Sequence, residues 1–153
     1  MKRITMAFVL FILLASCINA DKLVTENNLS VEYLKNIFKK AYYNVKTVKK
    51  DTFIKDRWKI YLDIDRSRKR YITFSVYWKL NPKFSYYEKL NLVNLIDKEV
   101  LMVSPYVKGN VITVKYDLWI QGGSTEKNII KAYKCFHKAL KLILKKDTKF
   151  VIK

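Results

Sequence analysis

Few side chains in this sequence are suited to covalent or acid–base chemistry. The single histidine, His137, follows Cys135 by two residues in a segment with helical periodicity, which sets their side chains about 200° apart around the helix axis. A cysteine–histidine nucleophile needs the two groups within hydrogen-bond reach, so this spacing argues against one. We expect His137 to be a surface residue on the basic side of the last helix, and Cys135 a small residue at the core margin.

Other groups give equally weak signals of catalysis. Asp63 and Asp65 fall on one face of a predicted strand, about 7 Å apart, and paired carboxylates can bind a cation or exchange protons. The surrounding sequence is strongly basic, so we interpret them as charges that offset their neighbours. Gly122 and Gly123 precede a predicted helix but lack the spacing of a phosphate-binding loop. We therefore predict no catalytic residues, no metal site and no cofactor.

Aromatic residues interleaved with lysines form the best candidate binding surface. The residues Tyr61, Tyr71 and Tyr77 alternate onto the polar face of two predicted strands, with Lys59 and Lys79 beside them. This combination suits stacking on bases or docking of an extended peptide. It also suits a sheet face that a helix or a second subunit covers.

A second candidate surface is the polar side of the last predicted helix. Three of its lysines are singled out as partner-binding residues: Lys134, Lys138 and Lys141. Such a surface would bind an anionic membrane, envelope surface or polymer.

The charge of the chain is large and positive. It contains 31 Lys and Arg against 13 Asp and Glu, and residues 21–153 retain 29 basic and all 13 acidic residues, a net charge of +16. Such a field favours anionic partners, but a general bias toward lysine would give the same charge. The lysines are spread along the chain instead of clustered, so nucleic acid is not the favoured partner.

The first twenty residues have the pattern of an export signal. Lys2 and Arg3 precede an apolar core over residues 6–14. This core is too short to span a bilayer as a helix. We therefore expect export to the periplasm, a membrane-anchored form or secretion.

Two processing sites fit this leader. The residues 14–17, Leu-Ala-Ser-Cys, resemble a lipobox, in which case residues 1–16 are removed and Cys17 carries the lipid. Cleavage after Ala20 would instead release a chain that starts at Asp21. Either route leaves Cys135 without an internal disulfide partner.

Hydrophobic periodicity predicts one α+β domain over residues 30–153, behind a polar tether over 21–29. We expect helices at 31–42, 87–97 and 125–146, with the middle helix burying Tyr87, Leu90, Val93 and Ile96. Strands are predicted at 45–54, 58–65 and 71–80, followed by a hairpin over 100–120. This α-β-β-β-α-β-β-α order predicts a mostly antiparallel five-stranded sheet with helices packed on it.

Leu90-Asn91-Leu92-Val93-Asn94 lies in the predicted middle helix, which leads into the hairpin up to Ile120, the glycine break at 121–126 and the helix after it. In these segments and in its order of elements the chain resembles the YbjN-like family, whose fold is related to type III secretion chaperones. The resemblance covers roughly 30–146. It implies a small non-enzymatic domain, a proposed sensory-transduction regulator that binds proteins as a chaperone does. It supplies no catalytic residues.

Family members are commonly acidic and cytoplasmic, whereas this chain is basic and has an export pattern, so the family's partners do not carry over. We expect a domain that binds an unknown protein or peptide, as a homodimer formed through its sheet or helices. Binding of an anionic polymer or envelope surface is the alternative.

Overall fold

The computed structural model describes residues 22–65 and 67–153. The leader, with its lipobox, Cys17 and the cleavage site after Ala20, lies outside these residues. Within the described part of the chain, none of the helices is both long and apolar enough to cross a membrane.

Alternating side chains build the centre of the sheet, as the sequence predicts. Strands β4 (Lys59–Ile64), β5 (Tyr71–Lys79) and β7 (Val111–Trp119) pair antiparallel. The longest ladder joins β5 to β7 from Tyr71↔Trp119 to Lys79↔Val111. Residues on one side of these strands are buried, among them Ile60, Phe74 and Val114, because each strand presents alternate residues to the core.

The main sheet has six strands in the order β2-β3-β4-β5-β7-β6, one more than predicted. The outer strands are β2 (Val45–Val48), β3 (Asp51–Lys55) and β6 (Ser104–Lys108). All neighbouring strands are antiparallel. The predicted α+β class is therefore confirmed.

The extra strand arises because the single strand predicted over 45–54 is a hairpin. β2 and β3 pair with each other and turn at Lys49 and Lys50. Lys49 has a φ of 57°, a conformation that usually falls to glycine or asparagine. A lysine there gives no turn signal, which is why the prediction missed it.

The segment suggested as a tether contributes to the fold. Residues Leu23–Val24 form β1, which pairs with β8 (Ser124–Thr125) in a separate two-stranded sheet. Val24 and Leu29 are fully buried. The side chain of Asn28 donates to the Leu23 carbonyl and accepts from the Thr25 amide, so the start of the described chain is fixed to the domain.

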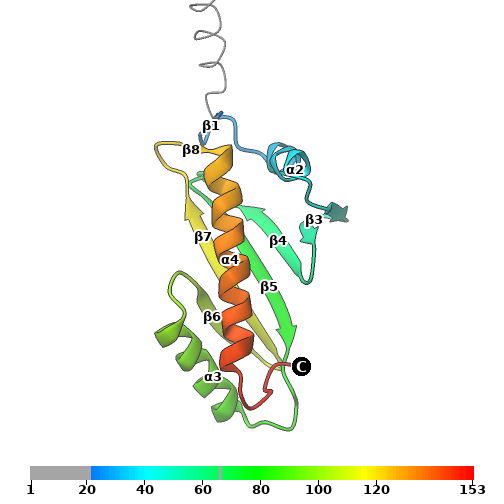
Figure 1. Cartoon of the computed structure of the whole chain (residues 1–153), viewed down its shortest axis with the longest axis vertical. Coiled ribbons are helices and arrows are strands. Elements are labelled where there is room, and N and C mark those ends of the chain that lie inside the picture. Colours follow the sequence, from blue (N-terminus) through cyan, green and yellow to red (C-terminus); the bar gives the residue numbers. More distant parts are fainter. Residues whose placement is uncertain (1–21, 66) are drawn as a thin grey trace, which may run out of the picture.

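Three helices cover one face of the main sheet (Figure 1). They are α2 (Val31–Lys40), α3 (Tyr86–Glu99) and α4 (Glu126–Lys146). Their N-caps are Ser30, Ser85 and Thr125, and Ser85 forms a capping box with Glu88. α4 lies along the sheet and buries one side: Ile129, Ala132, Tyr133, Phe136, Ala139, Leu140 and Ile143.

The predicted buried side of α3 is confirmed at Ile96 and wrong at Tyr87, which is 73% exposed. The fully buried residues of the helix are Lys89, Leu92 and Ile96. The Lys89 ammonium is satisfied because its Nζ donates to Asn110 Oδ1 at 2.7 Å. This partner comes from the β6–β7 turn, so the helix sequence alone does not reveal it.

Candidate functional site

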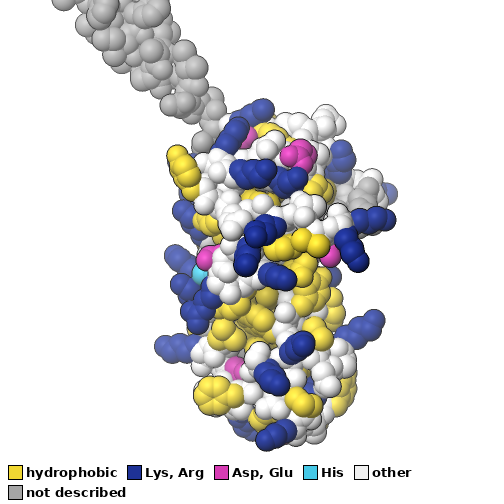
Figure 2. Space-filling view, turned by 90° about the vertical axis from the view of Figure 1, so that its right-hand side faces the viewer, with side chains coloured by type: hydrophobic (Ala, Val, Ile, Leu, Met, Phe, Trp, Pro, Cys, Tyr) yellow, Lys and Arg dark blue, Asp and Glu magenta, His cyan; other side chains and the backbone are white. Residues whose placement is uncertain are grey.

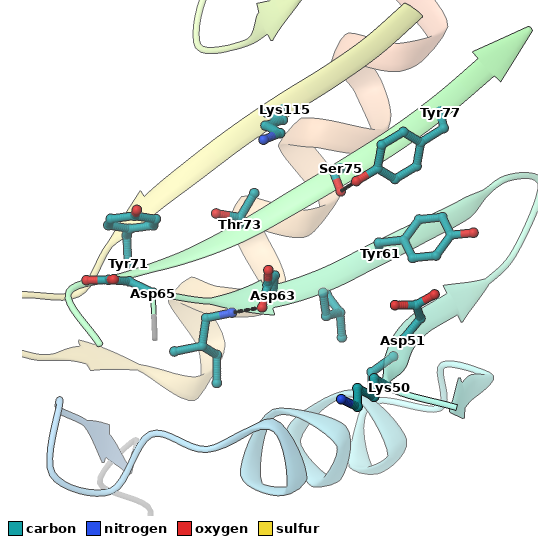
Figure 3. A pocket seen from close by; sticks show the side chains of 13 residues that line it. Lys50, Asp51, Tyr61, Asp63, Asp65, Tyr71, Thr73, Ser75, Tyr77 and Lys115 are labelled. Atoms are coloured by element: carbon teal, nitrogen blue, oxygen red, sulfur yellow. Dashed lines mark hydrogen bonds between the residues drawn. The ribbon is translucent and has the colours of Figure 1, made fainter. Parts of the chain in front are cut away.

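The other side of the sheet, which no helix in the described chain covers, is the candidate site. We call it the open face. In Figure 3 its side chains point toward the viewer while α4 lies behind the sheet. The three predicted partner-binding tyrosines, Tyr61, Tyr71 and Tyr77, all lie on it. The sheet register therefore brings together residues that the sequence separates.

A hollow of about 340 Å³ lies in the middle of the open face. Its lining combines aromatic rings, hydroxyls and charged groups: Lys50, Asp51, Tyr61, Asp63, Asp65, Tyr71, Thr73, Ser75, Tyr77 and Lys115, with Thr52, Leu62 and Ile64 at its base. Tyr61 packs against Tyr77 with 5.1 Å between ring centroids and against Phe53 at 5.6 Å. Tyr71 packs in the same way on Trp119, at 5.6 Å. These contacts hold the rings in place while Tyr77 and Trp119 remain 49% and 61% exposed.

Lysines surround the aromatic rings. Lys59 Nζ lies 5.4 Å from the Phe53 centroid, and Lys115 Nζ lies 5.3 Å from the Tyr106 centroid. Such cation–π contacts orient the long side chains at modest energetic gain. Lys79, the second predicted lysine, is an exposed residue at the end of β5.

An acidic row crosses the open face beside these rings. Thr73 stands opposite Asp63 on β4 and Asp117 on β7, and the β3–β4 register places Asp51 beside Asp63. Thr73 Oγ1 donates to Asp117 at 2.5 Å. We call Asp51, Asp63 and Asp117 the acidic row. In the described part of the chain, no ion pair involves any of the three.

Asp63 and Asp65, predicted to offset their basic neighbours, have different hydrogen-bond partners. Asp63 accepts from the Ile64 amide at 2.9 Å and belongs to the acidic row. Asp65 instead organises the β4–β5 turn, where its carboxylate accepts from the Ser67 hydroxyl and amide. These hydrogen bonds, led by that from the Ser67 side chain, lower the pKa of Asp65.

A second polar cluster lies at the side of α4, and sequence reasoning missed it. His137 is not a free surface residue: its ring packs 4.9 Å from Trp58, and Nε2 lies 3.4 Å from Asp56 Oδ2 without hydrogen-bond geometry. The neighbouring Tyr133 hydroxyl is buried and has no hydrogen-bond partner among the described residues. Desolvation raises the pKa of Tyr133 and lowers that of His137, although Asp56 opposes the shift in His137. Asp56 is far from His137 in sequence, so no local pattern reveals the contact.

Cys135 also differs from the prediction, since it is exposed and not at the core margin. The residues described by the structure include no cluster of three or more potential metal ligands. Gly123 is explained by packing, because a Cβ there would lie 2.9 Å from Leu23 Cδ1.

The predicted lysines of α4 lie on its solvent side. Lys134, Lys138 and Lys141 are all exposed, and none forms an ion pair with a described acidic residue. Figure 2 shows lysine and arginine side chains scattered over the whole visible surface, with few acidic groups between them. α4 is therefore one part of a generally basic surface.

Comparison with known proteins bears on the fold. No family model and no curated protein matches this sequence. The solved structure of YbjN from E. coli, described as a proposed transcription regulator, superposes with a TM-score of 0.72 over 86% of this chain and 99% of that one. The fold is YbjN-like. At 12% sequence identity the likeness concerns the fold alone, and the residues of the open face must be interpreted on their own chemistry.

Proposed function

We propose that this YbjN-like chain is an exported, non-enzymatic domain that binds a protein on the open face of its sheet. The observation that supports this most is a complete sheet face without a covering layer, on which ordered aromatic rings stand among charged groups. Half-exposed tyrosine and tryptophan are the side chains that contribute most to protein interfaces. Antiparallel sheets with one wet face are common, but such a face is normally polar throughout.

The composition of the open face favours a protein over nucleic acid. The acidic row stands in the middle of the surface that a nucleic acid would have to cover, and its carboxylates would repel phosphates. The leader pattern supports export. Cys17 is the proposed lipid attachment site if the lipobox is used.

A second candidate function is attachment to an anionic polymer or envelope surface through Lys134, Lys138 and Lys141. The unpaired state of these lysines among the described residues favours it. An interaction of this kind would weaken steeply as salt is added.

Photo-crosslinking in the native host separates the two candidates. A photoreactive residue replaces Tyr77 on the open face or, in a matched variant, Lys138 on the solvent side of α4. We expect a protein adduct from position 77, identified by mass spectrometry, and none of comparable yield from position 138. Adducts from position 138 alone, with lipid or polymer, would support the second candidate, and no adduct from position 77 would contradict the first.

A further inference from the structure

We propose that the open face binds a second copy of this chain, in a two-fold dimer that sets Asp51 and Asp63 of each copy against lysines of the other. This inference rests on the proposed function, because it names the protein partner of the same surface. The proposed dimer follows from the change in sign of the side-chain charges along the strands. The sheet register aligns these charges from one strand to the next.

Two further rows run parallel to the acidic row. The central row lies two residues from the acidic row along each strand. It consists of Phe53, Tyr61, Ser75 and Lys115. We call the residues two positions further along each strand the basic row. In it Lys55 lies beside Lys59 on β3 and β4, and Tyr77 lies beside Thr113 on β5 and β7. Within strands β3 and β4, carboxylates thus lie on one side of the central row and lysines on the other.

A two-fold axis along the central row makes these two sides complementary. The rotation lays each strand over its own copy in the opposite direction, so that residues equidistant from the central row face each other. Asp63 then faces Lys59 of the second copy, and Asp51 faces Lys55. Because a two-fold interface is self-complementary, each pair occurs twice.

The same rotation pairs aromatic rings with other side chains further from the axis. On β7 it places Trp119, the most exposed ring of the open face, over Val111 of the second copy. On β5 it places Tyr71 over Lys79, a pairing that permits a cation–π contact. Lys115 meets its own copy near the axis, but its ammonium is turned toward the Tyr106 ring on β6.

Charge repulsion disfavours the other face-to-face dimer, in which the two-fold axis would run parallel to the strands. An axis parallel to the strands would set the acidic row against the acidic row and lysine against lysine, and like charges across an interface are unfavourable. Facing sheets pack about 10 Å apart, a gap that a lysine and an aspartate can bridge together.

The size of the open face fits a stable dimer. The six strands contain 38 residues, which at a rise of about 3.3 Å per residue and a strand spacing of about 4.8 Å cover about 600 Å². This area per partner matches the lower end, about 1,200 Å² in total, of the range that specific interfaces bury.

Charge reversal tests both the dimer and its register. Lys59 and Asp63 are exposed, so their reversal leaves the core intact. We expect the protein isolated from its host to be a dimer by analytical ultracentrifugation. Lys59→Asp or Asp63→Lys should each raise the dissociation constant about tenfold or more. The double variant K59D/D63K should return it to within about threefold of the original, because each swapped pair is again of opposite charge.

Matched controls reverse charges that lie away from the open face, Lys83→Asp and Asp97→Lys, and should leave the dissociation constant unchanged. A monomeric protein, single variants that bind as tightly as the original, or a double variant that stays weak would each overturn the proposed dimer. A monomer that crosslinks a different protein from position 77 would overturn the dimer and leave the proposed function standing. A dimer insensitive to all of these changes, with no adduct from position 77, would overturn both.

Discussion

At the scale of single residues, His137 is the group whose environment departs most from expectation. Packing on Trp58 removes water from the imidazole and lowers its pKa below the ordinary value of 6.5; Lys141 and Arg57 act in the same direction, and Asp56 acts against them. The unfolded chain therefore binds a proton at a higher pH than the folded one. Stability from this group is present above about pH 6.5 and is lost as the pH falls from there toward the folded pKa.

The Asp56→Asn variant tests this environment. Removing the carboxylate leaves desolvation unopposed, so we expect the pKa of His137 to fall further. The chain has a single histidine, so its ring signals can be followed by NMR through a pH titration. Asp97→Asn, a change at an exposed site on α3, is the control and should leave the titration unaltered. A pKa that rises in Asp56→Asn would show that Asp56 does not face the ring.

Among the secondary structure elements, the C-terminal tail depends most on one side chain. Asp147 is buried at the end of α4, and its carboxylate accepts from the amides of Val151 at 2.9 Å and Ile152 at 2.7 Å. These bonds hold Ile152 against Leu80, where the tail forms an isolated bridge at the end of β5. The tail thus reaches the main sheet through this single bridge.

We expect Asp147→Ala to lower the free energy of unfolding by about 2 to 4 kcal/mol, because two amide donors lose a charged acceptor. Asp147→Asn should cost less, since its remaining oxygen can still accept one bond. Denaturant titration of both variants measures the effect, with Asp97→Ala as the exposed control. A loss in Asp147→Ala no larger than in the control would show that the tail contributes nothing to stability.

The elements also show what the sequence could predict. The three N-caps and the alternation of β4, β5 and β7 are local patterns, so the helix starts and the common face of Tyr61, Tyr71 and Tyr77 were predictable. The acidic row was not, because it depends on the register between β3, β4, β5 and β7. The burial of Lys89 and the approach of Asp56 to His137 likewise depend on partners distant in sequence.

At the scale of the whole molecule, the site of processing decides where the domain works. If Cys17 carries a lipid, only four residues lie between it and Lys22, and the five steps of chain reach at most about 18 Å. The Lys22 carbonyl accepts from the Glu126 amide at the start of α4, so that end of the domain would be held close to the membrane. α4 is about 31 Å long, which allows Lys141 to lie well away from the lipid surface when the domain stands upright.

The intact mass of the protein isolated from its host distinguishes the two routes. Because the lipobox and the alternative site differ by four residues, a chain starting at Cys17 with acyl groups has a different mass from an unmodified chain starting at Asp21. Under the lipid-anchored route, Cys17→Ser should release the domain from the membrane fraction and abolish the acyl mass. Under the second route the substitution should change neither mass nor location, since residue 17 is removed with the leader. A protein that keeps Met1 and its leader would contradict processing by either route, and the charge to be explained would then be the +18 of the full chain.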